Sequence, residues 1–159
     1  MKIRSLILSS VLAVAFAVPA VAQADEIEGT WKFVMRKLPD GKTLEPPAIQ
    51  GLVRWDNGVF SYVVHWPSPE GKPAFQAGIS SYKISDKDYT ETVLFCVVDD
   101  GSGKPPIYLP AETKTTPVTR EGGRVAFKLP FAPVSLAFEG DKDTGTMEGG
   151  VVDLWERVH

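Results

Sequence analysis

Histidine and cysteine, the usual protein ligands of transition metals, are scarce in this chain. The only histidines are His65 and His159, and the only cysteine is Cys96. Zinc normally needs several nitrogen or sulfur ligands at set spacings, and these three residues do not provide them. Cys96 lies in an apolar run, where a cysteine usually behaves as a small buried hydrophobe. We therefore expect no metal site and no cofactor, and we interpret His65 as a strand residue rather than a haem ligand.

An acidic segment near the C-terminus has the composition of a calcium loop but not its spacing. Asp141 and Asp143 are followed by Gly145 and Glu148. An EF-hand loop needs oxygen ligands at positions 1, 3 and 5, glycine at 6 and glutamate at 12. Here glycine comes at position 5 and glutamate at 8. The pattern therefore predicts a solvated hairpin turn.

Sequence motifs of nucleophilic or nucleotide chemistry are absent from the chain. There is no G-x-S-x-G elbow, no P-loop and no G-x-G-x-x-G segment. We therefore expect a protein that is not an enzyme. An isomerase or cyclase that uses His65 or Tyr82 as acid or base stays as a third alternative, and it requires at least two titratable side chains in one pocket.

Aromatic side chains are the remaining signal, because they recur along apolar strands. Most of them are explained by core packing, and some are candidates to line an apolar pocket with a few polar groups. The predicted ligand-binding residues are Tyr62, His65, Trp66, Phe75, Tyr82 and Phe95. Ser61, Gln76 and Ser80 are further polar candidates. Beyond the first strand, the sequence alone does not decide which face of a strand points inward.

These residues require strands to position them, and short strands dominate the chain. Alternating or apolar runs bounded by turn residues cover 30–37, 49–55, 59–66, 74–85, 89–98, 117–120, 124–129, 134–138 and 151–158. Asp56-Asn57-Gly58 and Gly122-Gly123 are hairpin signals. The pattern predicts an all-β fold, namely an eight- to nine-stranded antiparallel up-and-down barrel, because closure removes exposed sheet edges. A two-sheet sandwich is the rival.

The N-terminal segment is typical of a bacterial signal peptide. Lys2 and Arg4 precede an apolar run over 5–18, which ends in small residues around Ala22. We predict cleavage after residue 22, with residue 24 as the alternative, and one mature domain over 23–159. The run is shorter than the roughly 20 residues of a membrane-spanning helix, so we expect no stable membrane insertion. The expected location is the periplasm or the exterior.

The charge of the mature chain narrows the class of partner. The chain carries a formal charge of −3, and removal of residues 1–22 takes away Lys2 and Arg4, which leaves −5. A mildly acidic domain without a basic stripe is a poor candidate for binding nucleic acid. We expect no nucleic-acid partner; a protein partner stays open.

The two ends of the mature chain resemble lipocalins and their bacterial relatives. Gly29-Thr30-Trp31 matches the G-x-W of the first strand, and Trp155-Glu156-Arg157 resembles the last strand. The resemblance implies a calycin-type barrel in which Trp31 plugs the closed end and Arg157 packs across its ring. It implies that Gly29 lets the chain cross close beneath the barrel. The chain departs from the family in having no mid-chain T-D-Y segment, no clear helix before the last strand and no disulfide.

Three functions follow from this architecture, in descending order of preference. The first is an exported barrel that binds a small apolar or amphipathic ligand, which enters opposite Trp31 and Arg157 under a lid formed by residues 99–113. The second is an envelope interaction or inhibitor protein with a filled barrel. The third is the isomerase or cyclase described above. The volume of the cavity discriminates between the first two functions, because an open interior favours the first and a filled interior favours the second.

Overall fold

The computed structural model describes residues 26–159, so the predicted signal peptide and its cleavage site lie outside the described residues. The described chain forms one antiparallel sheet that closes on itself into a barrel, because β1 pairs with both β3 and β12. The barrel strands are β1 (Gly29–Lys37), β3 (Gln50–Asp56), β4 (Val59–Pro67), β5 (Pro73–Ile84), β6 (Asp88–Asp99), β8 (Thr113–Glu121), β9 (Arg124–Lys128), β10 (Val134–Glu139), β11 (Lys142–Met147) and β12 (Val152–Val158). Two short strands, β2 (Thr43–Leu44) and β7 (Ile107–Tyr108), pair with β1 and β6.

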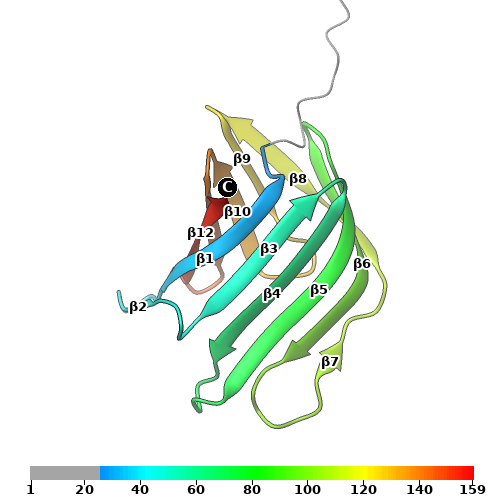
Figure 1. The fold of residues 1–159 in the computed structure, drawn as a ribbon. Helices are drawn as coiled ribbons and strands as arrows, with labels where there is room; N and C mark the ends of the chain where they lie inside the picture. The colour runs from blue at the N-terminus through cyan, green and yellow to red at the C-terminus, as the bar shows by residue number, and fades with distance from the viewer. Residues whose placement is uncertain (1–25) are drawn as a thin grey trace, which may run out of the picture.

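The predicted all-β, up-and-down order is confirmed, because neighbouring barrel strands follow one another along the chain (Figure 1). The predicted count of eight to nine strands is wrong: the barrel has ten strands, and two short ones lie beside it. The additional strand is β11, in a segment whose Asp, Lys and Gly content is typical of a turn. Its pairing with β10 and β12 over nearly its whole length overrides that local preference.

At one end of the barrel, which we call the closed end, Arg157 packs across the ring of Trp31. The Arg157 guanidinium lies 4.4 Å from the centroid of the Trp31 ring, which is a cation–π geometry. It also donates hydrogen bonds to the main-chain carbonyls of Glu28 and Glu26. Gly29 has a positive φ of 131°, and a Cβ there would lie 2.8 Å from Arg157 Nη1. Glycine is therefore needed where the chain passes this guanidinium.

The barrel core is a layer of aromatic rings next to the closed end. Trp55 is 1% exposed, is stacked on Phe60 at 3.9 Å between centroids and makes edge contacts with four further rings. The Trp31 indole N–H donates to the carbonyl of Ile27 at 2.9 Å. Other core side chains are Phe33, Tyr82, Tyr89, Val125, Phe127, Leu136, Phe138 and Trp155. This layer fills the barrel interior between the closed end and the middle of the strands.

Residues 26–159 contain no helix that is long and apolar enough to cross a membrane.

Candidate functional site

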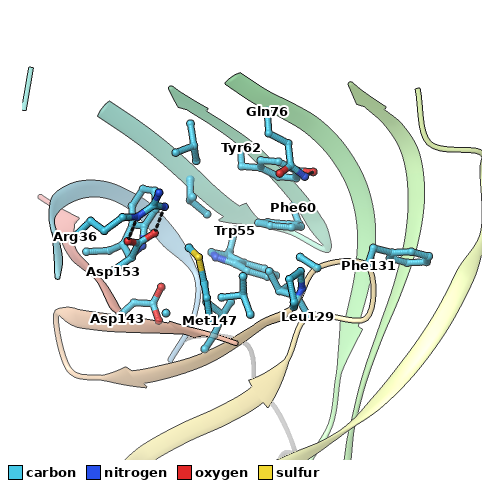
Figure 2. A pocket seen from close by; sticks show the side chains of 18 of the residues that line it. Arg36, Trp55, Phe60, Tyr62, Gln76, Leu129, Phe131, Asp143, Met147 and Asp153 are labelled. Carbon is cyan, nitrogen blue, oxygen red and sulfur yellow. Dashed lines mark hydrogen bonds and ion pairs between the residues drawn. The ribbon is translucent and has the colours of Figure 1, made fainter. Parts of the chain in front are cut away.

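A cavity of about 390 Å³ occupies the other half of the barrel interior. Its walls come from β1, β3, β4, β5, β6, β10, β11 and β12, together with the loop 129–133 between β9 and β10. The lining residues are Arg36, Val53, Trp55, Phe60, Tyr62, Val64, Trp66, Gln76, Glu91, Leu129, Phe131, Ala132, Pro133, Val134, Leu136, Asp143, Gly145, Met147, Asp153 and Trp155. Most of these side chains are apolar, and Figure 2 shows Trp55 and Phe60 below Tyr62 and Gln76. The volume and lining are those of a small-molecule site.

A buried ion pair forms one wall of the cavity. Arg36 Nε and Nη2 each lie 2.7 Å from an oxygen of Asp153, so the two side chains form a bidentate pair (Figure 2). The side chains are only 15% and 4% exposed. Arg36 and Asp153 are register partners on β1 and β12, which places both on the inner face. The fork geometry uses both carboxylate oxygens of Asp153.

Asp143 lies on the inner face of β11, and this corrects the prediction of a solvated turn. Its register partners are Trp155 and Phe138, so the pairing turns its side chain toward the core. Burial raises the pKa of the Asp143 carboxyl to about 7, and the negative charge of Asp153 adds to this shift. Hydrogen bonds with the backbone of Ala137 and Thr144 act in the opposite direction. At neutral pH both protonation states of this carboxyl are therefore populated.

Two buried polar atoms on the cavity lining have no hydrogen-bond partner among the described residues. They are Oδ1 of Asp143 and the indole Nε1 of Trp55. A buried polar atom without a partner costs about 1–3 kcal/mol of folding free energy. In a ligand site, such a polar atom can gain a hydrogen-bond partner when the ligand binds. Both residues line the cavity, and both atoms are buried.

Other polar groups of the cavity bond to each other or to neighbouring side chains. Glu91 accepts hydrogen bonds from Ser80 Oγ at 2.7 Å and from Tyr89 Oη at 3.1 Å. Burial raises the pKa of Glu91, while these two hydrogen bonds lower it. On β4, β5 and β6, Gln76 Nε2 donates to Tyr62 Oη at 3.0 Å, and Tyr62 Oη lies 3.2 Å from the Cys96 sulfur. These groups form two satisfied clusters.

The structure brings two of the six predicted ligand-binding residues to the cavity. Tyr62 and Trp66 lie on the inner face of β4 and line it, as does Gln76, one of the further polar candidates. The cavity lies opposite the Trp31 end, where the sequence placed the ligand entrance. The predicted lid 99–113 contributes no lining residue; the loop 129–133 does so instead.

The other four predicted residues lie elsewhere. His65 is exposed and pairs with Phe75 across β4 and β5, which places both on the outer face. Phe95 is 48% exposed, because the register between β5 and β6 shifts beside it. Tyr82 lies in the aromatic core next to the closed end. Neither His65 nor Tyr82 therefore lines the cavity in which an acid or base would act.

Sequence reasoning missed the charged lining residues Arg36, Glu91, Asp143 and Asp153. A signal existed for Asp153, which lies two residues before Trp155 and so shares its face of the strand. The same spacing places Glu91 between Tyr89 and Val93 on one face. No such signal existed for Arg36, because a register irregularity between Phe33 and Met35 breaks the alternation.

No group of three or more metal-ligating side chains occurs within residues 26–159. A scan against protein-family models found no match to this chain, and a search of curated proteins found no similar sequence.

Proposed function

We propose that this protein is an exported, non-enzymatic carrier, related to lipocalins, that binds a small apolar or amphipathic molecule inside its barrel. The observation that carries this proposal is the cavity of about 390 Å³ in the half of the barrel away from Trp31. The relation to lipocalins rests on Gly29, Trp31 and Arg157, whose types and contacts agree with the closed end of that family. A barrel of this kind has room for one small ligand when its own side chains do not fill it.

The alternatives have less support. A filled barrel is the premise of the interaction or inhibitor function, and the cavity argues against that premise. The isomerase or cyclase function assigned acid–base roles to His65 and Tyr82, and neither lines the cavity. Export to the bacterial periplasm or exterior is part of the proposal and rests on the sequence of residues 1–22.

The test begins with mature protein purified from its own host under native conditions. Native mass spectrometry is expected to detect a bound small molecule, and an uncharged fluorescent apolar probe is expected to bind at one site. A variant with a plugged cavity, Gly145→Leu, should lose probe binding, because Gly145 faces the cavity. The matched control Thr146→Leu adds the same side chain one residue away, at an exposed position.

A ligand-free mass together with no probe binding to the wild-type protein would overturn the carrier function. Equal probe binding by wild type, Gly145→Leu and Thr146→Leu would place the probe outside the cavity and would have the same consequence.

A further inference from the structure

The charged groups that face the cavity differ in whether they already have partners. Both oxygens of Asp153 accept from Arg36, so this guanidinium is not available to an incoming anion without breaking the pair. Both oxygens of Glu91 accept hydrogen bonds from Ser80 and Tyr89. Among the charged cavity residues, this leaves Asp143 as the one with an unpartnered oxygen.

The cavity also contains more acidic than basic side chains. Three carboxyl groups, on Asp143, Glu91 and Asp153, line it beside the single guanidinium of Arg36. The potential inside is therefore negative whenever a second carboxyl is ionised, and most of the surrounding wall is apolar. An electrostatic preference for cations is strengthened in such a low-dielectric setting.

We propose that the ligand is an amphipathic amine whose ammonium group pairs with the Asp143 carboxylate while its apolar body packs against the aromatic and aliphatic cavity wall. This inference rests on the proposed carrier function and specifies its ligand class. An ammonium supplies three donors and no acceptor, and it complements an unpartnered carboxylate oxygen better than a hydroxyl does.

The protonation state of Asp143 gives the proposal a second signature. Burial holds the pKa of Asp143 at about 7, and a bound ammonium favours the ionised carboxylate, so amine binding releases a proton near neutral pH. The other charged groups facing this region are Asp153 on β12, Arg36 on β1 and Glu91 on β6. Ionisation of Glu91, like that of Asp143, adds a negative charge that favours amine binding. The Arg36–Asp153 pair is neutral as a whole. Amine affinity should therefore rise from pH 6 to pH 8.

Three probes with one apolar body test the ligand class by titration calorimetry: 4-phenylbutylamine, 4-phenylbutan-1-ol and 4-phenylbutyrate. The mature protein is expected to bind the amine more tightly than the alcohol, and the carboxylate least. Asp143→Asn should weaken amine binding by about 10- to 100-fold, as expected for loss of a charged hydrogen bond, and leave the alcohol unchanged. The control Glu139→Gln removes a carboxylate from an exposed position of β10 and should alter neither affinity.

The outcomes separate this inference from the carrier function. Equal affinities for amine and alcohol, or a preference for the carboxylate, would overturn the amine and leave the carrier intact. Failure of all three probes and of the uncharged fluorescent probe would overturn both. Were Asp143→Asn unable to fold, the preference of the wild-type protein for the amine over the alcohol and its rise with pH would decide the question alone.

Discussion

The two halves of the barrel interior differ in whether their buried polar groups have hydrogen-bond partners. At the closed end the Trp31 indole N–H and the Arg157 guanidinium both find main-chain acceptors, and the rings around them are fully packed. Where the aromatic layer meets the cavity, Trp55 Nε1 lacks a partner, and in the cavity half Asp143 Oδ1 lacks one. Satisfied, close-packed groups stabilise a fold, whereas unpartnered buried groups destabilise it. The closed half therefore contributes more to the stability of the barrel. The cavity half contributes less, because it keeps open space and unpartnered polar groups.

The largest expected effect comes from truncating one tryptophan in each half. Trp31→Ala should lower the free energy of unfolding by about 3–5 kcal/mol, as is typical for a fully buried ring, because Trp31 is 1% exposed. Trp66→Ala should cost about 1 kcal/mol, because Trp66 is partly buried at the cavity wall. Urea denaturation followed by far-UV circular dichroism measures both. Similar losses in the two variants would contradict the division between the halves.

The ion pair of the cavity wall should have the next largest effect. Arg36→Met leaves Asp153 buried without its partner and should cost about 2–3 kcal/mol, somewhat less than for a fully enclosed pair. Lys32→Met is the matched control, since the Lys32–Glu156 pair joins the same two strands on the outer face with side chains 57% and 50% exposed. Its loss should be below about 0.5 kcal/mol. A destabilised Lys32→Met with an unaffected Arg36→Met would show that the inner pair is not structural.

The pH dependence of stability should report Asp143. Because its pKa is raised from 3.8 to about 7 in the folded state, folding favours the protonated carboxyl. The free energy of unfolding therefore falls as the pH rises through the window from about 4 to 7, and this contribution is lost above it. Asp143→Asn should remove a slope of up to about 1.4 kcal/mol per pH unit.

Denaturation of wild type, Asp143→Asn and Glu139→Gln at several pH values isolates the contribution of Asp143. The control removes an exposed carboxylate and should keep the slope of the wild-type protein. Parallel curves for wild type and Asp143→Asn would mean that Asp143 titrates normally and that the cavity carries no buried, protonated acid.

Local pattern was sufficient for most of the fold but not for the cavity lining. Hairpin signals such as Asn57-Gly58 and alternation such as that of Phe60, Tyr62 and Trp66 predict strands, because both depend on near neighbours. β11 escaped prediction because its residues favour turns, and only its pairing with β10 and β12 makes them a strand.

The site was predictable only where alternation stayed regular. Tyr62 and Trp66 share a face with Phe60 and reached the cavity, whereas His65 and Phe75 belong to the opposite face. Phe95 points outward because the register shifts next to it, and Arg36 points inward past another irregularity. A bulge shifts the register by one residue, so the side chains that follow it point to the opposite face of the sheet. Bulges depend on tertiary pairing that no local pattern encodes.

The smallest expected effect uses glycines to sharpen the contrast between packed and open positions. A Cβ at Gly145 would meet Val134 Cγ1 at 3.4 Å and Leu136 Cδ2 at 3.6 Å, which is ordinary contact. Gly145→Ala should therefore raise the free energy of unfolding by about 0.5 kcal/mol, since alanine restricts the unfolded chain. At Gly51 a Cβ would lie 2.6 Å from the Trp155 ring, so Gly51→Ala should instead be destabilising. Denaturation midpoints measure both variants, and opposite signs are expected because the added methyl makes ordinary contacts at Gly145 and clashes with a packed ring at Gly51.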